Sequence, residues 1–151
     1  MESRSVRFFT NTCRNCCNDI PIPLLGDFSY GEFLFQTEDG AEFGYAAAIL
    51  EPAWEAVSEI VTHALGIDLK KVSPAIDRYH AVMRRCADPI GGKRFTDDFP
   101  ICPICLKPMR NYGDSRVSHD ATIPSVSYSR FMELSSDERS GLVIRYWKEM
   151  G

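Results

Sequence analysis

Cys102-Pro103-Ile104-Cys105 and Cys13-Arg14-Asn15-Cys16 are the two stretches that decide the fold of this chain. Each is a C-x-x-C pair, and in a tight turn this spacing lets both sulfurs face one point. Pro103 favours such a turn because its ring fixes φ and it has no backbone donor. Two pairs supply four thiolates, enough for a closed tetrahedral site. The sequence therefore predicts that two segments far apart in the chain meet at one metal ion.

The two pairs resemble the half-sites of a zinc ribbon, in which each pair lies at the tip of a β-hairpin. The resemblance covers residues around 10–19 and 100–108 and leaves the long middle of the chain outside it. It implies a structural Zn²⁺ ion, and iron in a rubredoxin-like site is the alternative. The predicted metal ligands are Cys13, Cys16, Cys102 and Cys105.

Three further side chains qualify as metal ligands by residue type. Cys17 stands where ribbons commonly have glycine, which leaves the second ligand as Cys16 or Cys17, and the C-x-x-C geometry favours Cys16. His119 is the histidine near the second half-site and can substitute for a cysteine ligand. Cys86 falls on the apolar stripe of a predicted helix, so we expect it to be a small buried hydrophobic residue.

A length of 151 residues predicts one domain, 1–151, that can bury a hydrophobic core without help. The metal is then a staple at one end of the fold. Closing a long loop costs only logarithmically more than closing a short one. We therefore expect residues 30–87 to be an insertion, made of a hairpin and two helices, between the half-sites.

Local patterns predict an α+β fold with zinc-ribbon-like β-hairpins, a small antiparallel sheet and about three helices. Two aromatic-rich runs, 32–37 and 41–45, flank Asp39-Gly40 and predict a β-hairpin. Pro52 begins a helix that Gly66 ends. A second helix is expected over residues 74–86.

The C-terminal part of the chain carries three further expectations. The polar segment 107–122 reads as a loop or ribbon hairpin, and the alternation over 124–131 predicts a strand. Ser135 and Glu138 form a capping box, which predicts a helix over about 136–149. We expect this helix to dock on the ribbon or on the hairpin.

Charge argues against a nucleic-acid-binding surface. The net charge is −4, and residues 1–50 contain three arginines against seven acidic residues. DNA and RNA attract basic surfaces, so an acidic chain is a poor generic partner for them. The candidate surface for a nucleic-acid-binding zinc ribbon is Lys107, Arg110, Tyr112 and Arg116.

No apolar run in the sequence is long enough for a signal peptide or a membrane helix, which predicts a cytoplasmic protein with reduced thiols and no membrane partner. The motifs G-x-S-x-G, H-E-x-x-H, G-x-x-x-x-G-K-[ST] and G-x-G-x-x-G are absent. A four-cysteine site also has no open position for a catalytic water, so we do not expect an enzyme.

These patterns favour a zinc-stapled acidic module that binds another protein, as an adaptor or inhibitor such as a bacterial toxin-immunity protein. One alternative is the nucleic-acid-binding zinc ribbon. The second alternative is a dithiol oxidoreductase, which needs a C-x-x-C pair at the start of a helix.

Overall fold

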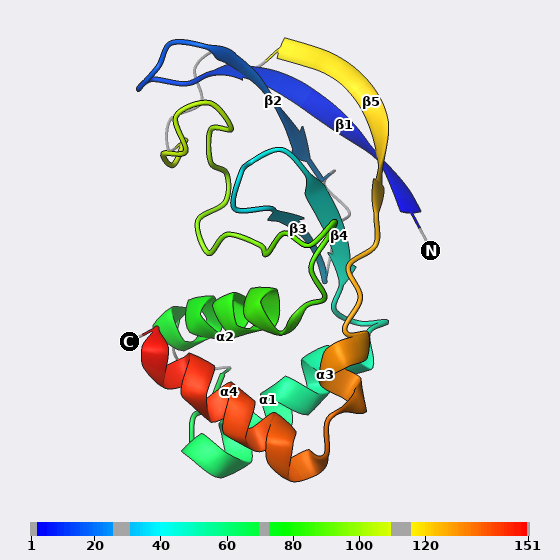
Figure 1. Cartoon of the computed structure of the whole chain (residues 1–151), viewed down its shortest axis with the longest axis vertical. Helices are drawn as coiled ribbons and strands as arrows, with labels where there is room; N and C mark the ends of the chain where they lie inside the picture. The colour runs from blue at the N-terminus through cyan, green and yellow to red at the C-terminus, as the bar shows by residue number, and fades with distance from the viewer. Residues whose placement is uncertain (1–2, 26–30, 70–72, 110–115, 151) are drawn as a thin grey trace. The chain divides into compact units, whose positions relative to one another are not determined.

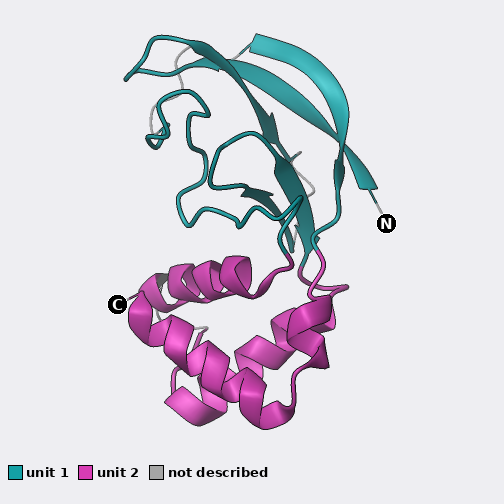
Figure 2. Cartoon of the chain, in the orientation of Figure 1, with its two compact units in different colours: residues 1–47, 89–126 teal, residues 48–88, 127–151 magenta. Residues whose placement is uncertain are grey.

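The computed structural model of the chain describes residues 3–25, 31–69, 73–109 and 116–150. The fold is α+β, as predicted, and divides into two compact units (Figure 2). The cysteine unit consists of residues 1–47 and 89–126, and the helical unit consists of residues 48–88 and 127–151. Both predicted half-sites fall in the cysteine unit, whereas the predicted insertion is shared between the two units.

A three-stranded antiparallel sheet of order β2-β1-β5 forms one part of the cysteine unit (Figure 1). Its strands are β1 (Ser3–Thr12), β2 (Asp19–Leu24) and β5 (Arg116–Pro124). The register of β1 and β2 ends with Thr12 opposite Asp19, so the first C-x-x-C pair lies in the turn of a β-hairpin. This is the ribbon-like placement that the sequence predicts.

The position of β5 corrects two sequence predictions. The sequence predicts a loop or ribbon hairpin over 107–122 and a strand over 124–131, but the strand is Arg116–Pro124 and residues Ser129–Glu133 form helix α3. Side chains 116–120 are all exposed. Of the β5 side chains only Ile123 is buried, so the alternation over 117–123 is a weak signal. The pairing of β5 with β1 is what makes it a strand.

The predicted hairpin is confirmed as β3 (Glu32–Gln36) paired with β4 (Phe43–Ala47). Its turn is held by the Asp39 carboxylate, which accepts hydrogen bonds from the Thr37 hydroxyl at 2.6 Å and the Ala41 N–H at 3.0 Å. The hairpin rings pack inward in edge-to-face pairs. Phe35 contacts Phe95, and Phe43 contacts Phe8 and Phe99.

The helical unit contains α1 (Pro52–Leu65), α2 (Ser73–Cys86), the short α3, and α4 (Ser136–Glu149). Gly66 ends α1 in the left-handed conformation, and the capping box of α4 is present in both directions, as predicted. Helix α4 packs against α1 and α2. Its buried side chains include Val143 and Trp147, and the expectation that it docks on the ribbon or hairpin stays a prediction.

Asp88 begins α3 by a contact that sequence patterns did not reveal. Its carboxylate accepts hydrogen bonds from the Ser127 hydroxyl at 2.7 Å, the Ser129 N–H at 2.9 Å and the Arg130 N–H at 3.1 Å. Burial acts to raise the pKa of Asp88, but these hydrogen bonds outweigh it and hold the pKa below its ordinary value. The carboxylate therefore acts as a long-range helix cap.

Asp88→Asn is expected to lower the free energy of unfolding by about 1 kcal/mol at pH 7, the usual effect of losing a cap. Because the folded-state pKa is depressed, the stabilisation is present above the unfolded-state pKa and is lost as pH falls through the folded value. The difference in unfolding free energy between Asp88→Asn and the wild type should therefore shrink below about pH 4. Thermal denaturation followed by tryptophan fluorescence measures this, since both tryptophans lie in the helical unit. A difference that stays constant down to pH 2 would contradict it.

Candidate metal centre

The four predicted ligands come together in the cysteine unit. The Sγ atoms of Cys13, Cys16, Cys102 and Cys105 all lie within 4.8 Å of one another. Cys13 Sγ is 3.7 Å from Cys105 Sγ, and Cys16 Sγ is 3.6 Å from Cys102 Sγ. Tetrahedral Zn–S bonds of about 2.3 Å place neighbouring sulfurs about 3.8 Å apart, whereas a disulfide needs about 2.0 Å. The spacing fits four thiolates around one ion.

The two C-x-x-C segments adopt the same backbone turn although their sequences differ. In the first cysteine turn, residues 13–18, the Cys13 N–H donates to the Asn18 carbonyl at 2.9 Å. In the second cysteine turn, residues 102–107, the Cys102 N–H donates to the Lys107 carbonyl at 3.0 Å. This equivalence is what a ribbon-like site requires, because each half contributes two sulfurs in the same way.

The residue after each C-x-x-C pair has a left-handed backbone conformation. Cys17 has a φ of 61° and Leu106 a φ of 62°. Their N–H groups donate to the carbonyls of Cys13 at 2.7 Å and Cys102 at 2.8 Å. This explains why glycine is common after such pairs, since it adopts positive φ without strain. Cys17 takes the backbone role of that glycine, and its side chain is exposed.

The remaining candidate ligands lie outside the cluster. The cluster contains Cys16 and not Cys17. His119 lies outside the cluster, and its ring stacks on Phe8 with centroids 4.8 Å apart and planes 6° apart. Cys86 is buried in α2, as predicted, and burial raises the pKa of its thiol to about 12.

Burial differs between the two members of each pair. Cys13 and Cys102 are buried, while Cys16 and Cys105 are half-buried. Hydrogen bonds from the Asn18 side chain and backbone lower the pKa of Cys16 to about 6. Burial raises the pKa of Cys102 to about 11, although the N–H groups of Cys105 and Ile104 act in the opposite direction. An apolar cluster encloses the inner sulfurs and consists of Ile20, Ile22 and Met109.

Gln36 connects the hairpin to the second cysteine turn. This residue is fully buried, and its side-chain amide accepts from the Ile101 N–H at 2.8 Å and donates to the Ile101 carbonyl at 3.0 Å. It also donates to the Gly40 carbonyl at 3.1 Å. The Gln36 side chain thus pairs with the residue immediately before Cys102 as a neighbouring strand would. Sequence reasoning missed it, although a lone glutamine at the end of an apolar strand was a visible signal.

Gly40 lets the hairpin turn approach the second cysteine turn closely. It has a φ of 73°, and a Cβ atom placed on it would lie 2.8 Å from the Cα of Pro103. Backbone atoms cannot move aside as a side chain can. Gly92 provides a matched comparison, because its φ is 78° and a Cβ there meets nothing within 4 Å.

Gly40→Ala is therefore expected to destabilise the protein by at least about 1 kcal/mol more than Gly92→Ala. Both substitutions carry the strain of alanine at positive φ, and only the first adds a clash with Pro103. Urea denaturation followed by circular dichroism provides the comparison. Equal midpoints for the two variants would show that the hairpin turn does not press on the second cysteine turn.

The surface considered for nucleic acid is only partly described. Lys107 is exposed, and Arg116 forms an ion pair with Asp19 at 3.5 Å. Arg110 and Tyr112 lie outside the described residues. Among the described members, one of the two cations already has an acidic partner within the sheet.

Comparison with protein-family models, curated proteins and solved structures finds no match to this chain. None of the helices in the described parts of the chain has the length and apolar character needed to cross a bilayer. The geometry of the residues defines the site as a candidate four-cysteine metal centre in an α+β fold.

Proposed function

We propose that this chain is a zinc-stapled protein-binding module, an adaptor or inhibitor, in which the metal holds the fold and a surface outside the metal centre recognises the partner. The observation that carries the proposal is the cluster of four sulfurs within 4.8 Å. Four thiolates complete a tetrahedral coordination sphere, so the ion has no position for a water or substrate. A role in structure fits this site better than a role in catalysis.

The contacts around the cluster support a structural ion. Gln36 and Gly40 fix the second cysteine turn from the hairpin. The β1–β2 register fixes the first cysteine turn. Zinc suits such a site better than iron because it has no redox chemistry and accepts tetrahedral sulfur ligands. The ion would then join two turns that are separated by most of the chain.

The dithiol oxidoreductase has less support. Redox C-x-x-C pairs open a helix, whose N-terminus stabilises the reactive thiolate. Here both pairs lie in turns closed by backbone hydrogen bonds, and the short sulfur–sulfur distances run between the two pairs. That arrangement suits an ion held between two turns.

Metal analysis and partner binding test the two halves of the proposal separately. Protein purified without added metal should contain one zinc ion per chain, as measured by inductively coupled plasma mass spectrometry. Affinity purification of the tagged protein from its native host should recover a partner protein. The purified partner should then bind this chain saturably at a fixed stoichiometry. Sub-stoichiometric metal in every preparation would refute the zinc staple. If zinc-loaded protein binds oligonucleotides at low salt but binds no protein, the alternative of a nucleic-acid-binding zinc ribbon is favoured instead.

A further inference from the structure

The second cysteine turn carries two exposed aliphatic side chains, which we call the apolar tip. Ile104 is 60% exposed and Leu106 is 56% exposed, and they stand on either side of the predicted ligand Cys105. Ile101 and Pro108 form a backbone bridge on the two sides of the turn. The apolar tip therefore projects beyond a bridged pair of residues.

Folding does not explain why aliphatic residues occupy these two positions. Asn15 and Cys17 stand at the equivalent positions of the first cysteine turn and are exposed as well. The same backbone turn therefore forms without aliphatic side chains there. Leu106 also has a φ of 62°, which strains leucine but not glycine. An exposed leucine buries little apolar surface, so its burial on folding offsets little of that strain.

The two cysteine turns also carry two exposed cations, Lys107 in the second turn and Arg14 in the first. The two turns lie together, because their ligand sulfurs are all within 4.8 Å of one another. Within the described parts of the chain neither cation forms an ion pair. Neither turn contains an acidic residue. The surface at the metal centre thus combines aliphatic side chains with unpaired cations.

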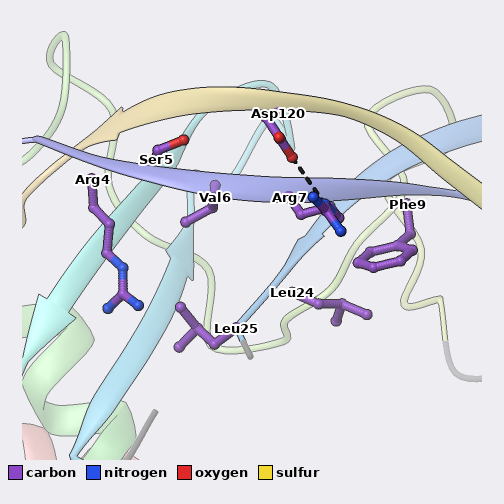
Figure 3. Close-up of a pocket in the computed structure, with 8 residues that line it drawn as sticks. All are labelled: Arg4, Ser5, Val6, Arg7, Phe9, Leu24, Leu25 and Asp120. Atoms are coloured by element: carbon purple, nitrogen blue, oxygen red, sulfur yellow. Dashed lines mark hydrogen bonds and ion pairs between the residues drawn. The ribbon is translucent and has the colours of Figure 1, made fainter. Parts of the chain in front are cut away.

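The cavity beside β1 differs from the apolar tip in its charges (Figure 3). It has a volume of about 550 Å³, and both of its cations already have acidic partners, Arg4 with Glu32 and Arg7 with Asp120. That cavity offers a partner no unpaired charge, whereas the apolar tip belongs to a pair of turns with two.

An apolar cavity of about 360 Å³ begins at the second cysteine turn. Pro103, the residue before Ile104, lines it together with Phe43 and Ile123. A protein surface can present a cleft to the tip and a side chain to this cavity. A lipid bilayer suits the site less well. The two tip side chains have fewer carbon atoms than a myristoyl chain, which alone binds membranes only marginally, and the net charge of −4 repels anionic lipids.

We propose that the apolar tip inserts into an apolar cleft of a partner protein, with acidic residues of the partner beside Lys107 and Arg14. This proposal rests on the proposed protein-binding function and assigns its surface. Aliphatic side chains that leave water supply affinity, and the exposed charges act mainly on the rate and specificity of association. The metal ion would hold the tip in a fixed conformation, which reduces the entropy lost on binding.

Two glycine variants at equivalent positions test the tip. Leu106→Gly removes a tip side chain and relieves the strain at positive φ, and Cys17→Gly relieves the same strain while leaving the tip intact. Both should bind one zinc ion per chain. Both should denature in urea at the same or a higher midpoint than the wild type, because relief of strain offsets the greater freedom of glycine in the unfolded chain. A lower midpoint in Leu106→Gly alone would mean that Leu106 serves the fold, which would overturn the proposal.

The probe is the partner protein recovered in the test of the proposed function, purified and titrated calorimetrically against the full zinc-loaded chain. Ile104→Asn is the second tip variant, since the first turn has asparagine at the equivalent position. The partner should bind Leu106→Gly and Ile104→Asn at least about tenfold more weakly than the wild type, but Cys17→Gly within about twofold, because only the first two remove a buried aliphatic contact.

Lys107→Gln tests the charge. Association with the partner should slow by about three- to tenfold at low salt, and the difference from the wild type should shrink at about 0.5 M salt. Offsetting the negative charge of a four-thiolate zinc site is the alternative role for this cation. Lower zinc affinity with an unchanged association rate would assign Lys107 to the metal centre and refute the acidic rim of the partner.

Equal partner affinity for Leu106→Gly, Ile104→Asn and the wild type would overturn the tip while leaving a protein-binding function intact. If the native host yields no partner, the proposed function fails and this proposal fails with it. Sedimentation with vesicles of equal parts phosphatidylcholine and phosphatidylserine that Leu106→Gly abolishes would make a bilayer the occupant and refute a protein cleft. Concentration-dependent dimerisation that Leu106→Gly abolishes would make the occupant a second copy of this chain and refute a foreign partner.

Discussion

Cys102→Ser should yield protein with no tightly bound zinc and with a free energy of unfolding lower by at least about 3 kcal/mol. Cys102 is fully buried, and its sulfur lies 3.6 Å from that of Cys16. A serine hydroxyl is a poor zinc ligand, so three thiolates would remain with an incomplete coordination sphere. Metal binding in such sites is coupled to folding, and the cysteine unit therefore loses the link between its two turns.

Cys86→Ser and Cys17→Ser are the matched controls. Cys86 is as buried as a ligand but lies in α2, and Cys17 is adjacent to a ligand but exposed. Both variants should keep one metal ion per chain. Elemental analysis and the thiolate-to-cobalt absorption of the Co²⁺-substituted protein measure the site directly, while tryptophan fluorescence follows the helical unit. Equal metal loss in Cys102→Ser and Cys86→Ser would mean that the ligand set is wrong.

Gln36→Met should destabilise the protein by about 3–5 kcal/mol, although methionine has nearly the same size and shape. The substitution leaves the N–H and carbonyl of Ile101 and the carbonyl of Gly40 without the partner that Gln36 provides. Gln36 is fully buried and Ile101 is 4% exposed. Each buried group left unsatisfied costs about 1–3 kcal/mol.

Leu34→Met in the same strand is the control, because it changes a buried side chain without removing a hydrogen bond. Its cost should be below about 1.5 kcal/mol. Amide hydrogen exchange at Ile101 gives the local readout, with protection lost in Gln36→Met and kept in Leu34→Met. Retained protection at Ile101 in Gln36→Met would show that the glutamine does not position the second cysteine turn.

The cluster of four cysteines was predictable because its signal is local in the sequence. A C-x-x-C pair favours one local turn geometry. Both turns adopt it, because Cys17 and Leu106 have equivalent backbone conformations at positive φ. The hairpin and the C-terminal helix were predictable for a similar reason, since an Asp-Gly turn and a capping box act over a few residues. The four cysteines that cluster and these elements could be deduced before any tertiary contact was known.

Features that depend on distant contacts could not be predicted in the same way. Strand β5 owes its conformation to β1, more than a hundred residues earlier, and its mostly exposed side chains give only a weak alternation. Helix α3 begins where it does because Asp88, about 40 residues away, accepts from its first N–H groups. Docking of α4 on α1 and α2 likewise depends on which apolar faces remain uncovered.

The long separation between the two cysteine turns has a consequence for biosynthesis. Cys13 and Cys105 are 92 positions apart. At about 5–20 residues per second, the first pair of thiols waits roughly 5–20 s on the ribosome before the second is made. During that interval the β1–β2 hairpin exposes the thiols of Cys13 and Cys16, and the four-cysteine site cannot yet form. These sulfurs in nascent chains would be vulnerable at this stage in an oxidising or copper-rich cell, whereas a bound ion would shield the four clustered sulfurs of the finished protein.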